Sequence, residues 1–112
     1  MKIKVDFGYP ILSDEVIQKL TKEDIYQSCK GISEVDETNI YFMLKATLCE
    51  CERMGKRAEC EKLCYLISDY LFFELTPAGS AYIALYYAEK AAAFSDNPEK
   101  YKNWIELVEK GN

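Results

Sequence analysis

The fold of this chain is decided by residues 38–75, TNIYFMLKATLCECERMGKRAECEKLCYLISDYLFFEL. On each side of Gly55, apolar residues recur every three or four positions, which is the spacing of amphipathic helices. The first stripe holds Ile40, Leu44, Thr47, Leu48 and Cys51, and the second holds Cys60, Leu63, Cys64, Ile67 and Leu71. The stretch therefore predicts an antiparallel helical hairpin, with helices over about 38–54 and 56–75 that meet at Gly55.

Helix start and stop signals extend this pattern in both directions. Ser13 predicts a helix to about residue 20. Thr21 with Asp24 predicts a second helix to residue 30, and Gly31 ends it. Residues 32–37 form an acidic connector. The pair Thr76-Pro77 predicts a helix over 76–94 that is apolar nearly all round and is therefore expected to be central. The pair Asn97-Pro98 predicts a last amphipathic helix that ends at Gly111.

The amino-terminal residues differ from the rest in the spacing of their apolar side chains. Residues 2–7 alternate polar and apolar, and Gly8 follows, which predicts an extended arm or a lone strand. We therefore expect a single all-α domain over residues 1–112, with an extended arm at 1–12 and helices over 13–111. Its architecture is a compact bundle of five or six helices built from antiparallel helical hairpins.

Composition limits the classes of function. The chain has no histidine, the residue on which most general-base and nucleophile-activation schemes depend, so we do not expect an enzyme. The net charge is −5 and no basic cluster is longer than Lys56-Arg57, so neither nucleic acid nor a membrane is an expected partner. There is no secretory signal pattern, and the five cysteines are an odd number, so a reducing, cytoplasmic location is predicted.

Four cysteines lie within residues 49–64 and could in principle bind zinc. On one helix, Cys49 and Cys51 point about 200° apart, so they cannot share a metal ion. Cys51, Cys60 and Cys64 remain as the ligand set of an alternative hypothesis, a zinc- or redox-responsive regulator. The favoured interpretation is that Cys60 and Cys64 are small core residues, so no cofactor is expected.

Two carboxylates, Asp69 and Glu74, interrupt an aromatic-rich run. Five positions apart on a helix, they diverge by about 140° and do not form an acid–base pair. They are expected to contact solvent or tyrosine hydroxyls. Glu34, Asp36 and Glu37 form a further acidic group, which is explained by the positive end of a helix dipole.

The chain is rich in aromatic residues, with nine Tyr, five Phe and one Trp. Ten Tyr and Trp exceed what so small a core needs, so we expect some to be exposed, where they act as interface anchors. The predicted function is non-enzymatic binding of another protein, possibly a basic one, as an inhibitor, immunity-type protein or adaptor. A self-associating structural subunit, and hence a homo-oligomer, is a further alternative. The candidate partner-binding residues are Tyr82, Tyr86, Tyr87, Tyr101, Trp104, Asp69 and Glu74.

Overall fold

The computed structural model describes residues 1–111, and within them the predicted all-α fold is confirmed, with six α-helices and no strand. The α-helices are α1 (Asp14–Lys19), α2 (Lys22–Ser28), α3 (Glu34–Arg53), α4 (Arg57–Asp69), α5 (Ser80–Phe94) and α6 (Lys102–Lys110). A π-helical turn, Tyr70–Glu74, continues α4, and a 3₁₀ turn, Pro98–Tyr101, precedes α6. Residues 1–12 form the predicted extended arm.

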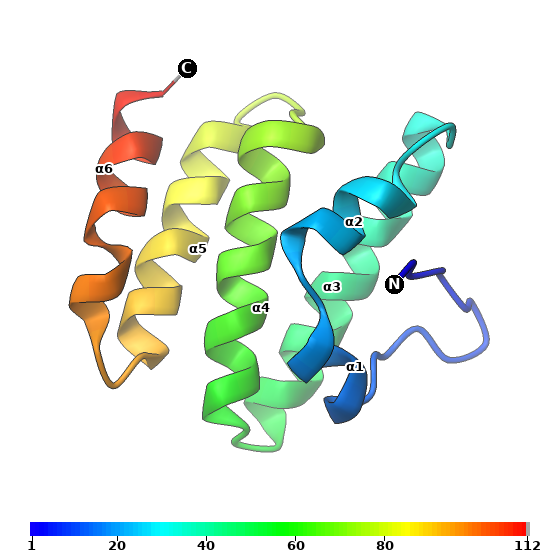
Figure 1. The fold of residues 1–112 in the computed structure, drawn as a ribbon, viewed down its shortest axis with the longest axis horizontal. Coiled ribbons are helices and arrows are strands. Elements are labelled where there is room, and N and C mark those ends of the chain that lie inside the picture. Colours follow the sequence, from blue (N-terminus) through cyan, green and yellow to red (C-terminus); the bar gives the residue numbers. More distant parts are fainter. Residues whose placement is uncertain (112) are drawn as a thin grey trace.

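Successive helices from α3 to α6 run antiparallel, side by side (Figure 1). Helix α1 packs on α4, and α2 packs on the π-helical turn that continues α4. The molecule is only 21 Å thick along its shortest axis, about two helix diameters. The predicted hairpin is therefore present, but the centre of the fold is α4, which packs on α1, α3 and α5. The expectation that residues 76–94 form the central helix is wrong, because one side of α5 faces solvent.

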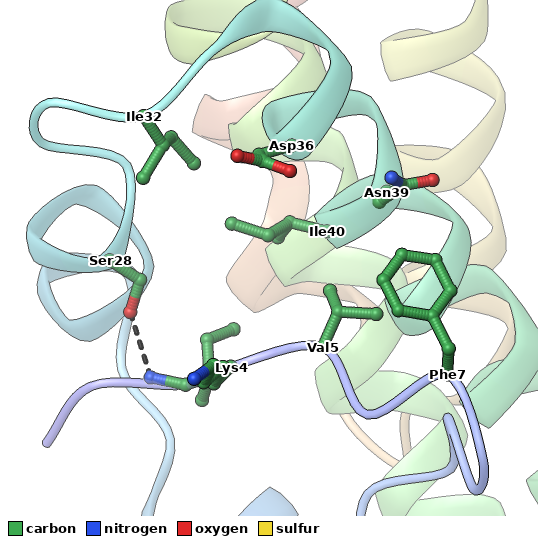
Figure 2. A pocket seen from close by; sticks show the side chains of 9 residues that line it. Lys4, Val5, Phe7, Ser28, Ile32, Asp36, Asn39 and Ile40 are labelled. Atoms are coloured by element: carbon green, nitrogen blue, oxygen red, sulfur yellow. Dashed lines mark hydrogen bonds between the residues drawn. The ribbon is translucent and has the colours of Figure 1, made fainter.

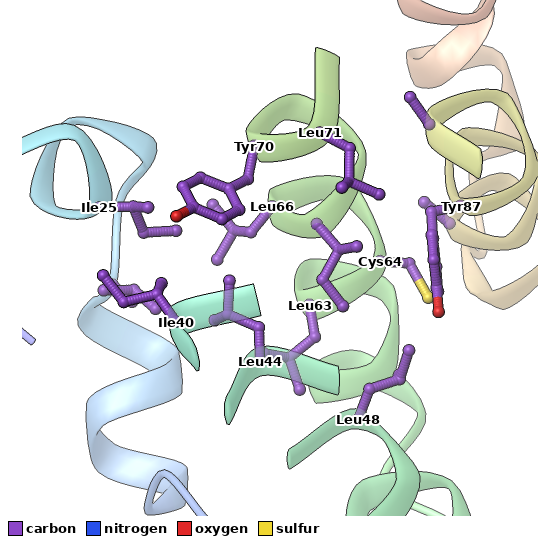
Figure 3. Packing of buried hydrophobic residues seen from close by; sticks show 14 of the residues in the cluster. Ile25, Ile40, Leu44, Leu48, Leu63, Cys64, Leu66, Tyr70, Leu71 and Tyr87 are labelled. Atoms are coloured by element: carbon purple, nitrogen blue, oxygen red, sulfur yellow. The ribbon is translucent and has the colours of Figure 1, made fainter. Parts of the chain in front are cut away.

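The core follows the stripes predicted from the hairpin. Leu44 and Leu48 of α3 meet Leu63 of α4, and Cys64 points toward Tyr87 of α5 (Figure 3). All ten stripe residues are buried, and Cys49 is exposed. Burying this many apolar side chains supplies the main driving force for folding at about 25 cal/mol per Å².

Side-chain caps fix where the early helices start. The side chains of Ser13 and Thr21 accept backbone hydrogen bonds from α1 and α2, as predicted, and Asp24 completes a capping box with Thr21. Ser33 caps α3 in the same way, so α3 begins at Glu34. The predicted connector over 32–37 is therefore too long, because Ser33 supplies a cap and the acids after it stabilise the first turn.

The second helix of the hairpin ends differently from the prediction. The α-helical spacing stops at Asp69, and the Leu75 N–H bonds to the Tyr70 carbonyl, five residues back, at 2.9 Å. The wider turn allows three successive large side chains, Tyr70, Leu71 and Phe72, to be buried together.

Helix α5 starts at Ser80 rather than at Thr76-Pro77. Gly79 has φ of +79°, a left-handed conformation that other L residues rarely adopt, so a helix cannot run through it. A Cβ added at Gly79 would meet nothing within 4 Å. Gly79 therefore serves backbone geometry, whereas close packing on α4 is the role of the fully buried Ala84 and Ala88.

Candidate functional site: the outer side of α5

Three large side chains cover the solvent-facing side of α5. Tyr82 is 83% exposed, Tyr86 is 56% exposed and Ile83 is 39% exposed. Tyr82 and Tyr86 are four residues apart and so lie on one face of the helix, with Ile83 beside them. We call these three residues the tyrosine face. The buried Ala84, Ala88 and Ala91 point the other way, toward the core.

Contacts from α3 hold the edge of α5 next to the tyrosine face. The Lys90 ammonium pairs with Glu52 of α3 at 3.1 Å and lies 5.6 Å from the ring centre of Tyr86. Tyr87 is buried, and burial followed by the neighbouring Tyr87 hydroxyl raises the pKa of Tyr41 of α3 to about 12. The backbone beneath the tyrosine face is thus fixed, and a partner would meet it without ordering a loop.

The predicted partner-binding residues of the last helical segment are structural. The buried Tyr101 donates its hydroxyl to Glu61 Oε2 at 2.6 Å, and the half-buried Trp104 donates Nε1 to Ser68 Oγ at 2.8 Å. Trp104 also packs edge-on against Tyr65, with ring centres 5.7 Å apart. Both side chains attach the last helical segment to α4, and of the two only the ring of Trp104 is partly exposed.

Asp69 is buried as well, and so is not a surface carboxylate. Its Oδ1 accepts a hydrogen bond from the Tyr26 hydroxyl, which fulfils the expectation of a tyrosine partner. Its Oδ2 is buried and has no hydrogen-bond partner among residues 1–111. Burial raises the pKa of Asp69, while the bond from Tyr26 favours the ionised form and opposes that rise.

Glu74 is half-buried at the end of the π-helical turn and lies near the acids that open α3. Burial raises the pKa of Glu37, and the negative charges of Glu74 and Glu34 raise it further. The fold thus gathers Glu34, Glu37 and Glu74, and we call this group the acidic end. The first turn of α3, which carries Glu34 and Glu37, lies toward the end of the molecule where α5 begins (Figure 1).

The hairpin cysteines divide into buried and exposed thiols, as the helical phase predicts. Cys51, Cys60 and Cys64 are buried, and burial raises the pKa of Cys60 to about 11 and that of Cys64 to about 12. No disulfide forms among the five cysteines. Within residues 1–111, no three Cys, Asp or Glu side chains are arranged to hold a metal ion, so the zinc hypothesis has no ligand set there.

Sequence reasoning missed Ile83 and did not separate Tyr86 from Tyr87. The sequence does contain a signal that separates Tyr86 from Tyr87. Ala84, Ala88 and Ala91 define the inner side of α5, and helical geometry places Tyr82 and Tyr86 on the opposite side.

Comparisons with protein-family models, curated proteins and solved structures found no significant match to this chain. Within residues 1–111 no helix is both long and apolar enough to cross a bilayer.

Proposed function

We propose that this protein acts by binding another protein, without catalysis, through the tyrosine face and the acidic end. The observation that carries the proposal is the exposure of Tyr82, Ile83 and Tyr86 on one rigid helix. Tyrosine is enriched among residues that dominate binding energy, since its ring buries a large apolar area and its hydroxyl still finds a partner. An inhibitor, an immunity-type protein or an adaptor would use such a surface.

Charge supports a basic partner. The net charge is −5, the first turn of α3 carries Glu34 and Glu37, and α3 and α5 start toward the same end of the molecule (Figure 1). A positive surface would be steered to this end, and its salt bridges at the rim would orient it over the tyrosine face.

The absence of histidine supports the non-catalytic part of the proposal, because no side chain in the sequence titrates near neutral pH without a strong shift. Asp69 and Glu74, the carboxylates considered for acid–base work, occupy different environments, one inside the core and one at the acidic end. Five cysteines without a disulfide also suit a reducing cytoplasm, which is where we propose that the partner is met.

The test begins with affinity capture from the source cell by three immobilised forms of the full chain. These are the wild type, the double variant Tyr82→Ala/Tyr86→Ala, and Tyr9→Ala. Tyr9 is 69% exposed on the arm and serves as a matched control for the loss of an exposed ring. A partner that the wild type and the control retain and the double variant loses supports the proposal.

The captured protein is then purified and titrated calorimetrically at low and high salt. We expect weaker binding at high salt, because rim charges at the acidic end are screened. A partner that is retained equally by all three forms contradicts the proposal. A light-scattering mass showing a homodimer that the double variant dissociates would favour the self-associating subunit instead.

A further inference from the structure

A cavity of about 350 Å³ lies beneath the amino-terminal arm, far from the tyrosine face in the sequence. Its apolar walls are Ile3, Val5 and Phe7 of the arm, Ile32 of the α2–α3 connection and Ile40 of α3. It has room for roughly ten water molecules at about 30 Å³ each, in a protein whose core is otherwise closely packed. Cavities of this size and apolar character are typical small-molecule sites.

The arm crosses this cavity and is attached on both sides of it. On one side, the Ile3 N–H donates to Ser28 Oγ at 2.8 Å, and the terminal ammonium pairs with Asp24 at 2.9 Å (Figure 2). On the other side, the Leu12 N–H donates to Thr47 Oγ1 at 3.1 Å. The arm is thus attached to the helices at both ends and lines the cavity between these two attachments.

Phe7 marks the rim of the cavity. Its ring is 76% exposed although it lines an apolar space, so a guest in the cavity would give it a contact that it lacks. Ile3 and Val5 both line the cavity, at the period of two seen in the sequence.

The polar groups of the cavity indicate the head group of a guest. Asp36, which is exposed, and Asn39, which is half-buried, lie one turn apart on α3 and both line the cavity (Figure 2). None of the six ion pairs among residues 1–111 uses Asp36. A carboxylate and a carboxamide oxygen on a rigid helix can both accept hydrogen bonds from an ammonium group. Lys4, the cation of the lining, is on the arm and exposed to solvent.

We propose that this cavity binds a small amine with an apolar body, its ammonium group held by Asp36 and Asn39 and its body enclosed by the arm. The site is separate from the tyrosine face, whereas Asp36 lies on the same first turn of α3 as Glu34 and Glu37 of the acidic end. Binding of the amine and binding of the captured protein are measured separately, so either assignment can fail without the other.

Three matched probes test the head group: 4-phenylbutylamine, 4-phenylbutanol and 4-phenylbutyrate. Each is titrated into the full chain while the isoleucine methyl signals of Ile3, Ile32 and Ile40 are followed by NMR. Saturable shifts at these methyls, with the amine binding tightest, are expected. The absence of saturable shifts with all three probes, or binding of the butyrate at least as tight as that of the amine, overturns the proposal.

Two variants locate the binding within the cavity. Asp36→Asn should weaken the amine roughly tenfold and change the alcohol less than about twofold. Ile32→Trp fills the cavity and should abolish binding of the amine, whereas Leu107→Trp, at an exposed position on α6, should leave it unchanged. Thermal unfolding of each variant confirms that it is folded. Unchanged amine binding in folded Ile32→Trp overturns the proposal.

Discussion

The two sides of α5 differ in a way that hydrophobicity alone does not explain. The inner side carries three small residues, Ala84, Ala88 and Ala91, all fully buried, whereas two large side chains, Tyr82 and Tyr86, face solvent. Small residues bring the α5 backbone close to α4, so the inner side is shaped for packing. The exposed rings of Tyr82 and Tyr86 take no part in that packing on α4, although Tyr86 contacts the neighbouring Tyr87 edge-on, with ring centres 5.2 Å apart. This is why the tyrosine face is assigned to binding.

The tyrosines of α5 and of the segment before α6 also divide into buried and exposed side chains. The Tyr101 hydroxyl donates to Glu61, the Lys45 ammonium lies 5.1 Å from the ring centre of Tyr87, and both rings are buried. Tyr82 and Tyr86 have exposed rings. Inner tyrosines should therefore affect stability, and outer tyrosines should affect affinity.

The largest expected effect comes from enlarging an inner alanine. Ala88→Leu adds three carbon atoms where α5 meets α4, and overpacking should lower the free energy of unfolding by about 2–3 kcal/mol. Ala93→Leu is the matched control, since Ala93 is exposed on the outer side, and it should change stability by less than about 0.5 kcal/mol. Urea denaturation measures both, and equal effects would remove the distinction between the two sides.

Removal of one hydroxyl gives the next effect. Tyr101→Phe deletes the hydrogen bond to Glu61, which stays paired with Lys100 at 2.6 Å, so the loss should be about 1–2 kcal/mol. Tyr82→Phe, on the tyrosine face, should leave stability unchanged within error. If Tyr82→Phe destabilised the fold as much as Tyr101→Phe, the outer tyrosine would have a structural role that the structure does not show.

A smaller effect concerns Asp69 and the pH. Because burial raises its pKa in the folded state, folding favours the protonated form. Its contribution to stability is present below the ordinary value of 3.8 and is lost as pH rises through the raised pKa. Asp69→Asn cannot ionise, so its stability relative to wild type should increase with pH above that value. Asp96→Asn, an exposed carboxylate, corrects for the loss of one charge. A constant difference across the pH range would show that Asp69 is not desolvated.

The smallest perturbation extends the comparison to α3, where Cys49 is exposed and Cys51 is buried two residues later. An aromatic disulfide reagent at neutral pH should label one thiol, that of Cys49, before the other four. Burial both shields Cys51, Cys60 and Cys64 and raises their pKa, which keeps the reactive thiolate rare. Cys49→Ser should abolish the fast phase. Rapid labelling of several thiols would place the hairpin cysteines at the surface.

Much of the fold follows from local signals in the sequence. Ser13, Thr21 and Gly55 mark helix ends through caps and turn geometry, and the two stripes of the hairpin specify the core. The π-helical turn after Asp69 could not be predicted, because the apolar pattern of these residues also fits a regular α-helix with 3.6 residues per turn. Tertiary packing selects the wider turn. The start of α5 was not predicted correctly, because Thr76-Pro77 has the residue pattern of a helix start. The left-handed conformation of Gly79 delays the helix to Ser80.

The candidate site was only partly predictable, for a related reason. The phase of α5 separates Tyr82 and Tyr86 from Tyr87, and this phase can be deduced from the alanines. The burial of Asp69 depends on Tyr26, 43 residues away, and the gathering of Glu37 with Glu74 depends on how the hairpin closes. Such long-range pairings are not encoded in local spacing.

The central claim, that the tyrosine face is the partner site, is tested most directly by calorimetric affinity for the captured partner. The comparison is between wild type, Tyr9→Ala and Tyr82→Ala/Tyr86→Ala, all with unfolding curves that match. We predict that the double variant loses about 2 kcal/mol or more of binding free energy, roughly thirtyfold in affinity, while Tyr9→Ala binds like wild type. Equal affinity of all three forms would contradict the claim.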